Sequence, residues 1–368
     1  MRSYRTKHLS LKLIPVLLVA ACHSFAWGVD FTNQVRPILS EYCFHCHGPD
    51  KSTREAKLRL DLSEGALADL GGYSAVIPGK PEDSELMFRL HSEDEDELMP
   101  PPENGKSLTN EQKKILEDWI REGARYQEHW SFLPIDDPQV PEKNAKTQSD
   151  HPVDRFLARK LLNEPFSFAE QSDPVTLLRR LYFDLVGMPP TPEEAKNFLS
   201  DSSSEAYDKL IDRLLIDPRF GERMAVHWLD LVRYSDTIGY HSDNFMEVSA
   251  YRDYVIEAFN ENLPYDQFVI ENLAGDLIPE ATQKQKIASG YNRLLQTTQE
   301  GGAQAAEYKA IYQADRVRNF GIVWLGATTG CAQCHEHKYD PFTIKDFYSL
   351  AAFFADLKEK PVGRRNPN

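Results

Sequence analysis

The stretch Cys43-Phe44-His45-Cys46-His47 decides the fold of the first part of this chain. Two cysteines separated by two residues place their thiols where they can add across the two vinyl groups of one haem. The histidine that follows at once places an imidazole under the iron. The pattern therefore predicts covalent haem attachment through Cys43, Cys46 and His47.

Three other uses of a Cys-x-x-Cys pair compete with this interpretation: a disulfide, a thioredoxin-like redox pair, and half of a zinc site. A redox pair would need a strand before it and a long helix after it. Here a helical pattern precedes the motif, and Gly48-Pro49 interrupts the chain directly afterwards. His45 lies between the cysteines and is expected to face solvent or a haem propionate.

A sixth iron ligand should come from farther along the same domain. Met99 stands in Leu98-Met99-Pro100-Pro101-Pro102, where a rigid proline loop can hold a thioether at the iron. His/Met ligation would raise the reduction potential. The competing Met87 has helical spacing with Leu86 and Leu90, which predicts a core position.

Residues 30–126 read as one unit with a helix at each end. The first is predicted over 31–42, with Val35, Ile38 and Leu39 on one face. The second starts at a Thr109/Gln112 capping box and ends at Gly123. Residues 127–150, rich in Pro and polar residues, are expected to be a linker.

From 151 to 368 the apolar residues recur at helical spacing, and no period-2 runs with hairpin turns stand out. At 368 residues the chain exceeds the usual size of a single core, which favours two domains. The fold expected is therefore mainly α, with a smaller N-terminal helical domain and a larger mainly α-helical domain.

Several motifs resemble a known pairing of families. The first unit resembles the planctomycete-type cytochrome c domain. The resemblance lies in Val29-Asp30-Phe31, the Cys43 motif, Pro78-Gly79-Lys80-Pro81, Met99-Pro100-Pro101 and Trp119-Ile120 to Gly123-Ala124. It implies haem binding and electron transfer. The second resembles the uncharacterised (DUF1549-type) domain that commonly follows, through Asp184 to Pro190, His227 to Tyr234, Pro264 to Phe268, Leu273 to Leu277 and Cys331 to Pro341. The resemblance implies no reaction for this second domain. Members usually continue into a further large domain, so we expect this chain to lack that C-terminal part.

A second motif, Cys331-Ala332-Gln333-Cys334-His335, predicts a second haem held by Cys331, Cys334 and His335. The nearby His337, Lys338 and Asp340 keep a zinc site open, and a disulfide is the third alternative. If haem binds, His337 cannot reach the opposite face of the iron because two residues of chain do not span a porphyrin.

The sixth ligand of a second haem must therefore come from elsewhere. His227 is the candidate, because it begins a segment that the family resemblance covers, and His241 is the weaker choice. A hydrogen-bonded structural histidine is the alternative for His227. Six charged residues in apolar helical segments are expected either to line a pocket or to form buried ion pairs: Arg233, Asp236, Asp276, Glu300, Asp315 and Arg316.

The N-terminus predicts export. Residues 1–26 have the basic, apolar and small-residue order of a signal peptide, with an apolar stretch too short to span a bilayer. Cleavage after Ala26 competes with lipoprotein processing that would anchor Cys22. The protein is thus expected in the periplasm or cell envelope, with no transmembrane span after cleavage.

The formal net charge of −15 disfavours a nucleic-acid partner, since phosphate binding needs a basic surface. The acidic run Glu93-Asp94-Glu95-Asp96-Glu97 before Met99 could steer a basic redox partner of unknown identity. The sequence therefore predicts an exported c-type cytochrome acting as an electron carrier, with haem c as cofactor and a second haem as a relay. The rivals are a periplasmic redox-linked enzyme acting on an extracellular substrate such as a polysaccharide, and a zinc-stabilised binding module with one haem.

Overall fold

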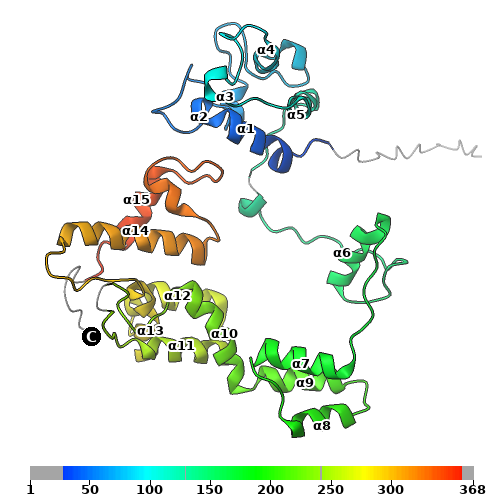
Figure 1. Ribbon diagram of the computed structural model, residues 1–368, viewed down its shortest axis with the longest axis vertical. Helices are drawn as coiled ribbons and strands as arrows, with labels where there is room; N and C mark the ends of the chain where they lie inside the picture. The colour runs from blue at the N-terminus through cyan, green and yellow to red at the C-terminus, as the bar shows by residue number, and fades with distance from the viewer. Residues whose placement is uncertain (1–27, 129, 241–242, 359–368) are drawn as a thin grey trace, which may run out of the picture. The chain divides into compact units, whose positions relative to one another are not determined.

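The computed structural model describes residues 28–128, 130–240 and 243–358, and it divides into two compact units, Met1–Leu133 and Pro134–Asn368. The regular elements of the described residues are helices, with four isolated β-bridges and no strand (Figure 1). The prediction of a mainly α fold is confirmed. The predicted signal peptide, Cys22 and His241 fall outside the described residues.

The first unit is built from short helices between irregular segments. Its first predicted helix forms as a π-helical turn η1 (Phe31–Val35) continued by α1 (Arg36–Tyr42). Next come α2 (Phe44–His47), α3 (Ser63–Ala66), η2 (Pro81–Asp83), α4 (Glu85–His91), η3 (Pro102–Asn104), α5 (Asn110–Arg121) and, at the end of the unit, η4 (Trp130–Phe132).

The capping box that the sequence predicts is present at the start of α5. The side chain of Thr109 accepts from the backbone N–H of Gln112, and the side chain of Gln112 accepts from the backbone N–H of Thr109.

The core of this unit joins its two ends. The ring of Phe31 lies 5.7 Å from Trp119 and 4.7 Å from Tyr126, measured between centroids. These aromatic contacts bind η1 to α5, and the segment between them is thereby closed into one unit.

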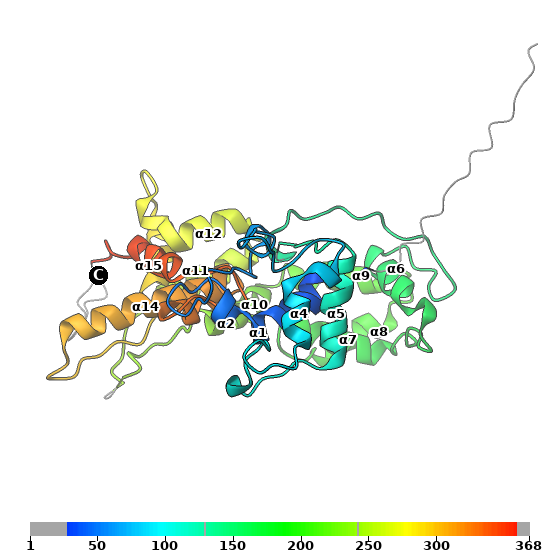
Figure 2. The same cartoon turned by 90° about the horizontal axis from the view of Figure 1, so that it is seen from above.

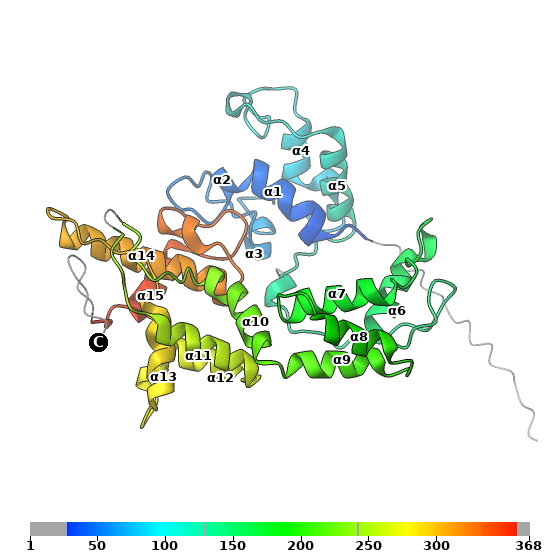
Figure 3. The same ribbon diagram turned by 60° about the horizontal axis from the view of Figure 1, so that its bottom comes forward.

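The second unit is a series of helices with three small cores. They are α6 (Pro152–Lys160), η5 (Leu161–Asn163), α7 (Pro174–Leu185), α8 (Pro192–Ser200), α9 (Ala206–Leu215), α10 (Pro218–Leu231), α11 (Ser249–Asn260), α12 (Tyr265–Ala274), η6 (Gly275–Leu277), α13 (Gln283–Ala288), η7 (Ser289–Arg293), α14 (Ala305–Trp324), η8 (Thr329–Gln333) and α15 (Ile344–Phe353). One core forms around α7 and α9, one around α10 to α14, and one between α14 and α15. Helix α10 packs on α11, and α14 on α15 (Figure 2 and Figure 3).

Helix α14 is held by buried polar side chains as well as apolar ones. Asn319 accepts a hydrogen bond from the Tyr291 hydroxyl at 2.9 Å and donates to the carbonyl of Leu231 at 3.3 Å. The Arg316 Nε donates to the carbonyl of Asn292 at 2.9 Å. Because a buried polar group without a partner is costly, these bonds favour one position of α14 against α10 and η7.

Within the described ranges, no helix is both long and apolar enough to cross a membrane.

Candidate functional site

In the first unit, four residues that the sequence singles out line one cavity. They are Cys43, Cys46, His47 and Met99, and the cavity has a volume of about 300 Å³. Its walls are mostly apolar, formed by Leu58, Leu60, Leu70, Leu86 and Leu90. A largely apolar pocket with a few convergent donor atoms has the character of a cofactor site.

The local backbone places the motif residues on one turn. Cys43 ends α1, where its N–H donates to the Leu39 carbonyl at 2.8 Å, and it also precedes α2. The N–H of His47 returns to the Cys43 carbonyl at 2.8 Å. The His47 carbonyl in turn accepts from the N–H of Leu60 at 2.8 Å. These bonds fix the turn against the segment that forms the cavity wall.

His47 has the state that an iron ligand needs. Its Nδ1 is buried and has no hydrogen-bond partner in the structure. Burial lowers the pKa of His47, and this effect outweighs two opposing effects of Glu55, one from its backbone and one from its charge. The imidazole is therefore neutral near pH 7, with its lone pair available.

Cys43 is unlike a redox-active cysteine. Burial, with a smaller contribution from Cys46, raises the pKa of the Cys43 thiol to about 12. Reactive cysteines in Cys-x-x-Cys redox pairs have lowered pKa values, because the thiolate is the nucleophile. The thioredoxin-like alternative therefore lacks its electrostatic requirement here.

The two competing methionines have different surroundings. Met99 lies on the cavity wall, and its N–H donates to the Arg89 carbonyl at 3.0 Å. Met87 is buried in the hydrophobic core of the same unit, at 7% exposure. His45 is exposed and does not line the cavity.

The cavity also has polar groups that sequence reasoning missed. Arg89 and Glu85 both line it and form an ion pair, with 2.8 Å between Nε and Oε1. Tyr73 and Asn104 also line it. The spacing of four residues between Glu85 and Arg89 was a visible signal for the ion pair. Nothing local in the sequence indicated that the pair lines the same cavity as Cys46.

The second motif lies on η8 and the loop after it, and it is exposed, whereas in the first motif Cys43 is buried and Cys46 and His47 are half-buried. Cys331, Cys334 and His335 are all exposed, and both cysteines are free thiols. The His335 Nδ1 lies 2.8 Å from the carbonyl oxygen of Glu336. Since a carbonyl can only accept, Nδ1 carries the proton of this bond, and in the neutral imidazole the lone pair is on Nε2.

His337 has the opposite arrangement and a structural role. It is 7% exposed, and its Nδ1 accepts hydrogen bonds from the N–H groups of Tyr339 at 3.2 Å and Asp340 at 2.8 Å. Its Nδ1 lone pair is thus used inside the loop. In the part of the chain that the structure describes, no three His, Cys, Asp or Glu side chains gather as a metal-binding group.

His227 is exposed on α10, and its role as sixth ligand stays a prediction. The adjacent Trp228 packs on Trp324, with 5.1 Å between ring centroids, so α10 contacts the end of α14 just before the second motif.

Within the predicted set of charged residues, Arg233 and Asp315 have the expected roles, whereas Asp236, Asp276 and Arg316 have other surroundings. Arg233 and Asp315 line a second cavity and form an ion pair at 2.5 Å. Asp236 instead accepts a hydrogen bond from Tyr234, and the exposed Asp276 lies outside the cavity. Arg316 is buried against the Asn292 carbonyl.

Comparison with known families gives two matches in the order that the sequence predicts. Residues 152–359 match the family described as a protein of unknown function (DUF1549). Residues 43–103 match the planctomycete cytochrome C family, which supports a haem-binding, cytochrome-like domain. The predicted resemblance is confirmed. No curated protein and no solved structure matches the chain.

The different burial of the two motifs predicts different thiol reactivity in chain produced without haem attachment. With iodoacetamide at mildly alkaline pH, Cys331 and Cys334 should be alkylated at least about tenfold faster than Cys43, which is buried and has a raised pKa. Peptide mass spectrometry over time measures the rates, and urea should make them equal. Equal rates in the native chain would contradict the burial of the first motif.

Proposed function

Because this chain belongs to the family described as a protein of unknown function (DUF1549), and because its first unit matches the planctomycete cytochrome C family, we propose that it is an exported c-type cytochrome that transfers electrons. The observation that carries the proposal is the gathering of Cys43, Cys46, His47 and Met99 on one apolar cavity. An electron carrier, rather than a catalyst, is the role these residues support.

Each of these residues has a distinct task in the proposed site. Cys43 and Cys46 would hold haem c covalently, and His47 and Met99 would be the protein ligands of its iron. The bound haem supplies one-electron chemistry. The surrounding leucines would keep water from the cofactor, and the thioether of Met99 would favour the reduced form and so raise the potential.

We also propose a second haem, attached at Cys331 and Cys334 with His335 as proximal ligand, that relays electrons within the second unit. Three features support this site. The two thiols and the imidazole lie exposed on one short segment, both cysteines are free, and the hydrogen bond at Nδ1 leaves the Nε2 of His335 available for iron. A proximal histidine is commonly oriented in this way by a carbonyl at its other nitrogen.

A basic redox protein is the proposed partner, and the periplasm or cell envelope is the proposed location. Glu93, Asp94, Glu95 and Asp96 are exposed and stand just before Met99 on the cavity wall. Exposed charge beside a cofactor accelerates encounter with a partner of opposite sign. The location follows from the predicted signal peptide.

The covalent haem count tests the proposal directly. We expect chain exported from a host with c-type maturation machinery to carry two haems by intact mass and pyridine haemochrome spectrum. Cys43→Ala should remove one haem and Cys331→Ala the other. A single haem, lost only with Cys43→Ala, would leave the second motif to a metal or a disulfide. A chain without haem would refute the cytochrome.

Met99 and Met87 provide a matched test of the axial ligand. Met99→Leu should remove the thioether–iron absorption band and lower the reduction potential, on a scale where axial ligands shift potentials over about 0.8 V. Met87→Leu makes the same replacement at a methionine in the core, and it should leave both the absorption band and the reduction potential nearly unchanged. Potentiometric titration of both variants measures this. A band that survives in Met99→Leu would refute the assignment.

The acidic run predicts how charge affects electron transfer. The triple change Glu93→Gln, Glu95→Gln and Asp96→Asn should slow oxidation of the reduced protein by tris(phenanthroline)cobalt(III) several-fold and accelerate oxidation by ferricyanide, because the first oxidant is a cation and the second an anion.

Stopped-flow measurements at low and high salt check this, since salt should reduce both effects. The control removes three exposed acidic residues of the linker, through Asp136→Asn, Asp137→Asn and Glu142→Gln. If both triple variants change the rates equally, net charge and not the acidic run is responsible.

A further inference from the structure

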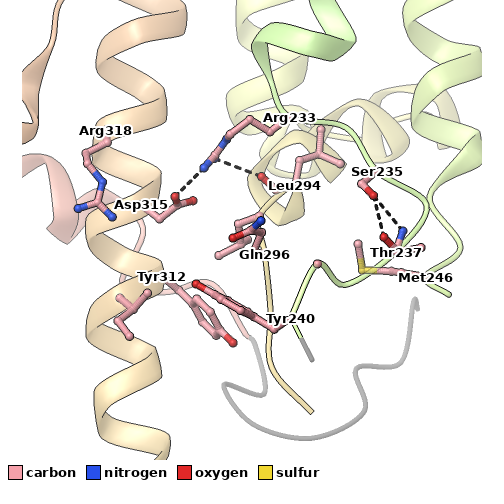
Figure 4. A pocket seen from close by; sticks show the side chains of 13 residues that line it. Arg233, Ser235, Thr237, Tyr240, Met246, Leu294, Gln296, Tyr312, Asp315 and Arg318 are labelled. Carbon is pink, nitrogen blue, oxygen red and sulfur yellow. Dashed lines mark hydrogen bonds and ion pairs between the residues drawn. The ribbon is translucent and has the colours of Figure 1, made fainter. Parts of the chain in front are cut away.

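The second unit holds a cavity of about 370 Å³ that neither family match explains. It forms where three segments meet: the chain after α10, the chain after η7, and α14 (Figure 4). Its volume is within the range of small-ligand sites. Its charged side chains are Arg233, Asp315 and Arg318.

One acceptor in this cavity has no donor. Asp315 accepts from the Nη1 of Arg233 at its Oδ1, at 2.5 Å, whereas its Oδ2 is buried without a hydrogen-bond partner. The same guanidinium reaches the Leu294 carbonyl with Nη2 at 3.4 Å. Because the charge of Asp315 is already balanced by Arg233, a neutral hydroxyl of a ligand is the most suitable group to donate a hydrogen bond to Oδ2.

One cation in the cavity has donors to spare. Arg318 lies three residues after Asp315 on α14, a spacing that makes the two residues neighbours on a helix surface, and both line the cavity (Figure 4). Its Nη1 donates to the Oε1 of Gln333 at 2.9 Å, and no other bond to its guanidinium is found within the described residues. Because Arg318 lines the cavity, its remaining N–H groups are donors for a carboxylate, for which a guanidinium is well shaped.

Hydroxyl groups complete the opposite wall. Ser235 and Thr237 lie 3.0 Å apart, oxygen to oxygen, and both line the cavity (Figure 4). Each hydroxyl can donate and accept, so the pair can bond to further hydroxyls. Two arginines against one aspartate leave one positive charge among the lining side chains. A ligand of charge −1 therefore complements the cavity better than a zwitterion, which has no net charge.

We propose that this cavity binds a small monoanionic hydroxy acid, with its carboxylate on Arg318 and its hydroxyls on Asp315 and the Ser235–Thr237 pair. The site is independent of haem attachment at the first motif. The Arg318–Gln333 hydrogen bond joins it to the second motif, because Gln333 lies between Cys331 and Cys334.

Calorimetric titration of the haem-loaded full chain at low salt tests the proposal, with sodium gluconate as the probe. Gluconate should bind saturably and at least about tenfold more tightly than three comparison compounds. Glucose lacks the anionic group, acetate lacks the hydroxyls, and serine lacks the net negative charge. Inorganic phosphate that binds as tightly as gluconate would reduce the site to a general anion site and overturn the proposal. Equal binding of serine would do the same, and so would the absence of gluconate binding.

Three variants locate the binding. Arg318→Gln should weaken gluconate at least about tenfold while leaving the weak binding of glucose unchanged. Gln333→Ala breaks the same hydrogen bond but keeps the guanidinium, so it should retain gluconate binding and separates loss of the ligand contact from a disturbed fold. Lys309→Gln removes an exposed cation elsewhere on α14 and should have no effect. Gluconate affinity that is equal in Arg318→Gln and Lys309→Gln would refute the site.

Discussion

The first unit depends on one constraint, the removal from water of the helical turn that carries Cys43 and His47. Burial raises the pKa of the thiol and lowers that of the imidazole, so both side chains stay neutral. Neutral groups can face an apolar cavity without the cost of burying a charge. The contacts of Phe31 with Trp119 and Tyr126 keep this turn closed, because they join the start of the unit to its last long helix.

The second unit depends on a different interaction, the hydrogen bonding of polar side chains along α14. Arg316 and Asn319 satisfy backbone carbonyls of η7 and α10, which fixes where the helix lies. Asp315 and Arg318, on another face, then point into the cavity. The same helix thus provides structural bonds on one side and a binding surface on the other.

Two motifs with the same spacing have opposite surroundings. Cys43 is buried beside a neutral histidine whose Nδ1 has no partner, whereas Cys331 is exposed beside a histidine whose Nδ1 is bonded. A buried Cys43 fits a haem that is enclosed within its own domain. An exposed Cys331 fits a haem whose remaining contacts come from residues outside the loop that carries the motif. His337, adjacent to the second motif, contributes to the loop and not to the cysteines.

By itself the sequence determined the local features: the helical segments, the Thr109/Gln112 capping box, the Cys-x-x-Cys-His turns and the order of the two families. These follow from spacing over a few residues, which side-chain chemistry and helix geometry translate directly. Only the tertiary structure decided that Arg89 and Glu85 line the same cavity as the cysteines, and that Arg233 meets Asp315 across 82 residues of chain. Such pairs depend on how helices pack, and packing is set by many weak contacts between distant residues that no local pattern records.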